Sequence, residues 1–151
     1  MTDILDKIIA HKRLEIEQQK AAISQELLIN NCNEPMPRRS MRASLSASPS
    51  GIIAEFKRRS PSKGWIKENA QADIISPAYE MAGASVLSIL TDENFFGGNL
   101  KDIRAARPQV SLPILRKDFI IDEYQLYQAC IVGADAVLLI AAALRKEQCS
   151  M

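Results

Sequence analysis

The chain has 151 residues, of which 47% are hydrophobic and 25% charged, as is typical of a soluble globular protein with one domain and a sizeable core. The formal net charge of +1 gives no electrostatic reason to expect nucleic acid or a membrane surface as a partner. The sequence has no run of about 18 apolar residues of the kind that spans a membrane, and its charged first residues are unlike a signal peptide.

The cysteines Cys32, Cys130 and Cys149 lie far apart in the sequence, and no Cys or His spacing typical of a zinc site is present. We therefore expect neither a disulfide framework nor a metal site. Free thiols in a reducing cytoplasm are the default for such a protein.

The first 48 residues predict helices and no strand. Apolar residues at helical spacing predict a helix over 2–21, with a polar and mostly solvated second half. Shorter helices are expected at 24–29 and within 38–49, separated by a stretch rich in asparagine and proline. Because no catalytic constellation stands out here, we assign residues 1–48 to an N-terminal helical extension.

From residue 52 the pattern changes to strand, loop and helix, repeated. Short apolar runs bounded by turn residues predict strands at 52–57, 85–91, 112–117 and 134–140. Crossover helices between them make the strands parallel, so an open doubly wound sheet and a (β/α)8 barrel both fit residues 49–151. The first strand–helix loop lacks the glycine pattern of dinucleotide-binding folds.

Helices are expected at 77–82, 99–107 and 122–133. Ser76 would cap the first, with Pro77 in the position where a missing N–H does no harm. Asn99 would cap the second, and Asp122 with Gln125 would form a capping box at the start of the third.

Functional groups of such folds gather at the carboxyl ends of the strands. Glu55 and Lys57 share one face of the first strand, because side chains alternate along a strand. Lys117 shares a face of the third strand with Phe119 and joins Glu55 and Lys57 if that face points inward. The alternative is that the first-strand charges lie in water and that Lys117 pairs outside with Asp118 or Asp92.

Two lysines and one carboxylate suit proton transfer, because burial and a second cation lower the pKa of a lysine and a carboxylate keeps another lysine charged. Three apolar residues near the same strand ends would form a wall for a flat or aromatic substrate: Phe96, Phe119 and Leu138.

Four ordered segments, 55–64, 88–98, 115–122 and 133–141, resemble the signature segments of indole-3-glycerol phosphate synthase. They read EFKRRSPSKG, SILTDENFFGG, LRKDFIID and GADAVLLIA. The resemblance implies a (β/α)8 barrel, of which residues 49–151 are the first four βα units. It also implies a cytoplasmic carboxy-lyase of tryptophan biosynthesis that needs no cofactor or metal. Such an enzyme closes the ring of a phosphorylated carboxyphenylamino-deoxyribulose, with loss of carbon dioxide and water.

The resemblance also implies roles for single residues. Lys117 would be the general acid at the substrate carbonyl, Lys57 would contact the substrate and serve in the later dehydration, and Glu55 would orient both lysines. Ser60 and Pro61 would line the substrate. The wall formed by Phe96, Phe119 and Leu138 would hold the anthranilate ring.

Proteins of this family have roughly 250 residues. We therefore expect strands five to eight, a second catalytic carboxylate and the phosphate-binding loops to lie outside these 151 residues. One alternative is a catalytically impaired half-barrel that self-associates through its exposed edges or binds only part of the substrate. Another is a sugar-phosphate enzyme in which Lys117 forms a Schiff base.

Overall fold

The computed structural model describes residues 3–32, 37–145 and 148. Its helices are α1 (Ile4–Ala22), α2 (Gln25–Cys32), α3 (Met41–Ala47), α4 (Ala72–Met81), α5 (Glu93–Phe96), α6 (Leu100–Ala106) and α7 (Tyr124–Val132), with 3-10 turns η1 (Arg107–Gln109) and η2 (Ala141–Ala143). Its strands are β1 (Ile53–Phe56), β2 (Arg59–Ser60), β3 (Gly64–Trp65), β4 (Val86–Leu90), β5 (Ile114–Lys117) and β6 (Ala136–Val137). No helix in the described part is long and apolar enough to cross a membrane.

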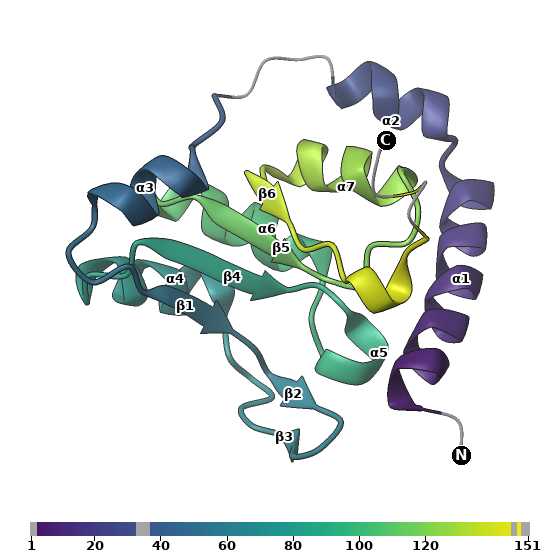
Figure 1. The fold of residues 1–151 in the computed structure, drawn as a ribbon, viewed down its shortest axis with the longest axis horizontal. Coiled ribbons are helices and arrows are strands. Elements are labelled where there is room, and N and C mark those ends of the chain that lie inside the picture. Colours follow the sequence, from purple (N-terminus) through teal and green to yellow (C-terminus); the bar gives the residue numbers. More distant parts are fainter. Residues whose placement is uncertain (1–2, 33–36, 146–147, 149–151) are drawn as a thin grey trace.

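Four strands form one parallel sheet in the order β1-β4-β5-β6, so strands that follow one another through a crossover helix are neighbours. This α/β arrangement confirms the predicted parallel βα units. All four carboxyl ends lie at one edge of the sheet, toward α5 and α1 in Figure 1, and α3 lies at the opposite edge. The short antiparallel pair β2–β3 projects from the loop after β1.

The core lies between the sheet and the crossover helices. Phe56, Leu87, Ile89 and Ile114 point from the strands to this side and are almost completely buried. They pack against buried residues such as Ile103 of α6, and α4 and α6 lie behind the sheet in Figure 1. Burial of such side chains contributes about 1.5–3 kcal/mol each, and it leaves the other strand face for function.

The N-terminal helices are packed onto this unit. Ile16 of α1 and Leu28 of α2 form a second apolar cluster with Tyr124 of α7, whose hydroxyl donates to the carbonyls of Gln19 and Ile23. The second half of α1 is mostly solvated, as predicted, but Lys12 and Ile16 are buried. The sequence pattern of a helix shows which residues share a face. It does not show which distant residues pair with a lysine on that face.

Two predicted boundaries are wrong. Helix α4 begins at Ala72, one turn before the expected Ser76 cap, so Pro77 lies inside the helix. An internal proline costs about 3 kcal/mol, and burial of Ala72 and Ser76 with packing of Tyr79 on the core offsets this. Strand β6 contains only two residues, Ala136 and Val137, which pair with Leu115 and Arg116 of β5.

The predicted cap of α6 is confirmed, whereas α7 begins one residue later than predicted, after Glu123, which makes no side-chain cap hydrogen bond. Asn99 and Asp102 form a reciprocal capping box at the start of α6. At α7 the Asp122 carboxylate accepts the Tyr124 N–H, and the Gln125 side chain accepts the Asp122 N–H. Gly133 ends α7 with a φ of 88°, a left-handed conformation that favours glycine.

The expectation of free thiols is wrong for two of the cysteines. Cys32 at the end of α2 and Cys130 of α7 form a disulfide, with their Cα atoms 5.9 Å apart. They are separated by 98 residues in the sequence, so their proximity depends on the packing of α2 against α7 and not on a local motif. The disulfide ties the N-terminal helices to the sheet unit.

Reduction of this disulfide is expected to lower the free energy of unfolding by about 2–4 kcal/mol, because the bond restricts the unfolded chain over a long loop. Urea unfolding with and without dithiothreitol measures the difference. Cys130→Ser serves as the matched variant and should unfold equally with and without reductant. An intact mass of the oxidised chain that shows no loss of two hydrogens would contradict the bond.

Candidate active site

A hollow of about 180 Å³ lies at the carboxyl ends of the parallel strands. It contains the predicted acid–base residues and the predicted apolar wall. The lining residues are Glu55, Lys57, Leu90, Phe96, Lys117, Asp118, Phe119, Leu138 and Ile140. Strand ends that are distant in sequence therefore meet where the alternation of side chains predicts.

Glu55 is at the centre of this hollow. Lys57 Nζ donates to its Oε1 and Lys117 Nζ to its Oε2, each over 2.9 Å. The parallel register produces this arrangement, because Glu55 stands beside Ser88 of β4 and Leu90 of β4 beside Lys117. The alternative in which Lys117 pairs with Asp118 or Asp92 is not the one observed.

The charge state of the group follows from these contacts. Burial alone would raise the pKa of Glu55, but the hydrogen bonds from Lys57 and Lys117 outweigh it and hold that pKa below its usual value. About a third of each side chain stays exposed, so solvent can reach the group. One carboxylate against two ammonium groups leaves a net positive charge, which suits an anionic ligand.

The apolar side of the hollow comes from different elements. The rings of Phe96 and Phe119 lie 5.9 Å apart at an interplanar angle of 35°. Phe96 is held by the short helix α5, whose first turn is capped where the Asp92 carboxylate accepts the Phe95 N–H. Leu138 follows β6 and completes this side of the hollow.

Ser60 and Pro61 do not line the hollow. Ser60 is buried in β2, where its hydroxyl accepts the Lys63 N–H, and Pro61 is exposed in the turn that follows. The β2–β3 loop is tied down beside the site, because the Arg58 guanidinium makes two short hydrogen bonds to Asp102, over 2.6 and 2.7 Å.

Sequence reasoning missed a buried charge cluster next to the hollow. Lys12 of α1 is fully buried, and its Nζ lies 2.9 Å from Asp92 and 3.1 Å from Asp118. Glu15, 2.8 Å away, completes the set at the rim. The only sequence signal is a lysine on the apolar face of α1, at helical spacing from Ile8 and Ile16.

Asp118 is the most heavily bonded member of this cluster. It accepts hydrogen bonds from the Thr91 hydroxyl, the Arg116 guanidinium and the Phe119 N–H. Burial would raise the pKa of Asp118, but Arg116 and Lys12 hold it below its usual value. Burial would likewise lower the pKa of Lys12, and Asp118 and Asp92 instead raise it above its usual value.

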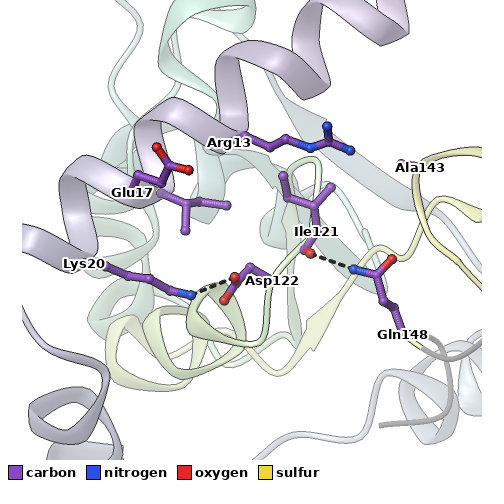
Figure 2. A pocket seen from close by; sticks show the side chains of 8 residues that line it. Arg13, Glu17, Lys20, Ile121, Asp122, Ala143 and Gln148 are labelled. Atoms are coloured by element: carbon purple, nitrogen blue, oxygen red, sulfur yellow. Dashed lines mark hydrogen bonds and ion pairs between the residues drawn. The ribbon is translucent and has the colours of Figure 1, made fainter.

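Another hollow, of about 340 Å³, lies between α1 and the residues that follow β5 (Figure 2). Arg13, Glu17 and Lys20 line it from α1, and Lys20 is turned toward Asp122, with a pair distance of 2.7 Å. It contains none of the predicted site residues. Among the residues that the structure describes, no group of three or more His, Cys, Asp or Glu side chains is placed to hold a metal ion.

Comparison with known proteins shows the family of this chain. The family model of indole-3-glycerol phosphate synthase matches residues 5–151. The chain belongs to the indole-3-glycerol phosphate synthase family. This family is a TIM barrel, and the four-stranded parallel sheet corresponds to part of one.

Curated relatives carry the same name. The indole-3-glycerol phosphate synthase of Bacteroides thetaiotaomicron is 68% identical over 149 residues, which cover 99% of this chain and 57% of that protein. That of Neisseria meningitidis serogroup B is 52% identical over 98% of this chain and 58% of its own length. That of Syntrophobacter fumaroxidans is 44% identical over 97% and 57%. The chain thus spans somewhat more than half the length of these relatives.

The two depressed carboxyl pKa values predict acid sensitivity. Near pH 4 the unfolded chain binds more protons than the folded chain, because Asp118 and Glu55 have pKa values below their usual ones when folded. Their contribution is complete above about pH 5 and is lost as the pH falls through about 4 toward the folded values. Urea unfolding at a series of pH values measures this loss.

Asp118→Asn is the test variant. It is expected to lower the free energy of unfolding at neutral pH by about 3–5 kcal/mol, because Lys12 and Arg116 lose a buried partner. Its stability should also depend less on pH below about 4 than that of the parent chain. Equal acid dependence in the two proteins would mean that other carboxylates carry the effect.

Proposed function

We propose that this chain provides the acid–base side of an indole-3-glycerol phosphate synthase active site. The reaction is ring closure, decarboxylation and dehydration of 1-(2-carboxyphenylamino)-1-deoxyribulose 5-phosphate to indole-3-glycerol phosphate. The observation that carries the proposal is the Glu55 carboxylate held between Lys57 and Lys117 beside an apolar wall. The net positive charge of the group suits a substrate with a carboxylate and a phosphate.

The geometry supports different roles for the two lysines. Lys117 pairs with Glu55 and lines the same hollow as Phe119, so its ammonium can donate a proton to a carbonyl of a ring compound that rests on the wall. Lys57, on the other oxygen of Glu55, can contact the same substrate and act in the dehydration. Glu55 orients both lysines. Ser60 and Pro61, which lie outside the hollow, would contact only a part of the substrate that extends toward the first loop.

The proposal includes the organisation of the chain and its setting. Residues 1–48 form a helical extension and residues 49–151 the first four βα units, which agrees with helices α1 to α3 preceding β1. The setting is tryptophan biosynthesis in the cytoplasm.

Indole-3-glycerol phosphate formation, followed by absorbance with synthetic substrate, tests the proposal. The 151 residues joined to the C-terminal part of the Bacteroides thetaiotaomicron relative should be active, and the 151-residue chain alone much less so. In the longer chain Lys117→Ala should lower kcat by about 10²–10⁴, because general acid catalysis contributes that factor. Glu55→Gln should lower it less, because both lysines remain.

Activity that survives Lys117→Ala would show that Lys117 is not the general acid. Treatment with borohydride in the presence of substrate tests the alternative in which Lys117 forms a Schiff base. We expect no covalent adduct on Lys117 by peptide mass spectrometry, and an adduct there would replace the acid–base role by a nucleophilic one.

We further propose that the 151-residue chain associates with itself when studied alone. β1 and β6 are the outer strands of the sheet, and outer strands present backbone groups that can pair with another chain. Ile52, just before β1, and Ile53, its first residue, are about half exposed, as is Leu139 after β6. Leu139 also lines an apolar groove with Ile120, Leu126, Val137 and Leu144.

Light scattering across a concentration series should therefore give a mass above that of one chain, rising with concentration. Replacing Leu126 and Leu139 by lysine should reduce the association, because both side chains lie in the groove. A single monomer mass for the parent chain at high concentration would contradict the proposal.

A further inference from the structure

The buried ion pairs of Lys12 connect the N-terminal helix to the loops that carry the site residues. Asp92 follows β4 and caps the helix that holds Phe96, and Asp118 stands between Lys117 and Phe119. Lys12 Nζ contacts both carboxylates from α1. In the described part of the chain Lys12 is the only polar partner of Asp92 Oδ2.

The charges of this cluster balance only when Lys12 is counted. Two buried carboxylates, Asp92 and Asp118, face two buried cations, Lys12 and Arg116. Glu15 adds a partly exposed negative charge, with His11 at 4.0 Å from it. Without Lys12, Arg116 would still pair with Asp118, but Asp92 would lose its cation, and an unpaired buried charge costs several kcal/mol.

A further cation beside this cluster is Lys117. Asp118 lines the same hollow as Lys117 and is its neighbour in the chain. A lysine side chain is flexible and carries a compact charge, so it can change partner within its reach. In a chain without Lys12, Asp118 would have lost one of its two cations. The partly exposed Glu55 would then compete with the buried Asp118 for Lys117.

We propose that Lys12 is a positioning residue for Lys117. By neutralising Asp92 and Asp118 it removes the competing carboxylates and leaves Lys117 paired with Glu55 in the hollow. This inference rests on the proposed role of Lys117 as the general acid. The N-terminal helix thus supplies a charge that the site needs, without touching the substrate.

Competitive labelling of lysines tests this in the 151-residue chain itself. The chain is treated briefly with an acetylating reagent, and peptide mass spectrometry compares Lys117 with the exposed Lys67 as an internal reference. In Lys12→Met the relative rate at Lys117 should fall about fivefold, because an ammonium drawn into a buried ion pair reacts more slowly. Lys12→Gln, equally uncharged, should act in the same way.

Matched variants separate charge from packing. Lys20→Met removes a lysine from the same helix that pairs with Asp122 at 2.7 Å, and it should leave the labelling of Lys117 unchanged. Lys12→Arg keeps the charge and should preserve the parental rate. Lys12→Met with Asp92→Asn should restore that rate, since asparagine still caps α5 while the excess negative charge is gone.

The far-ultraviolet and near-ultraviolet circular dichroism spectra identify the variants that are folded. Unchanged labelling of Lys117 in a folded Lys12→Met or Lys12→Gln chain would overturn the inference. So would slow labelling in the charge-balanced double variant, because the loss would then come from packing. The measurement needs no turnover, so its failure is distinct from failure to form indole-3-glycerol phosphate.

Discussion

The hydrogen bonds of Glu55 depend on a parallel register that brings three strand ends to one edge of the sheet. Glu55 lies level with Ser88, and Leu90 with Lys117, so β1 and β5 face each other across β4. Lys57, two residues after Glu55, donates to one carboxylate oxygen, and the register brings Lys117 of β5 to the other. The buried core on the other face of the sheet holds the register in place.

The charged residues around these strand ends are sorted into two sets. Glu55 with Lys57 and Lys117 is partly open to solvent, whereas Asp92 and Asp118 with Lys12 and Arg116 are almost fully buried. The open set carries a surplus positive charge that a ligand can compensate. The buried set is balanced within the protein, so its energy does not depend on a ligand. Lys117 and Asp118 are adjacent in sequence yet belong to different sets, because Lys117 pairs with Glu55, and Asp118 pairs with Lys12 and Arg116.

Much of this could be predicted from local patterns. Alternation along the first and third strands predicted that Glu55, Lys57 and Lys117 share a hollow, and cap residues such as Asn99 predicted where a helix begins. The disulfide of Cys32 with Cys130 and the partners of Lys12 could not be predicted in this way. Each depends on contacts between residues about 80 or more positions apart, which the packing of α1 and α2 creates.

The errors at α4 and β6 have a related origin. Pro77 is a strong local signal for the start of a helix, but burial of residues before it extends α4 by a turn. The apolar run through Leu138 is a strong signal for a strand, but only Ala136 and Val137 of this run pair with β5. Local propensity is a weak preference that tertiary contacts override.

A boundary near residue 48 separates two patterns of sequence and does not separate two independent structures. Helix α1 contributes Ile16 to an apolar cluster with Tyr124 and contributes Lys12 to the charge balance beneath Lys117. Removal of the helix would therefore expose apolar surface and also leave two buried carboxylates with a single cation. The second effect is electrostatic and acts at the strand ends. The charge balance beside the site therefore depends on the N-terminal helix as well as on the first βα units.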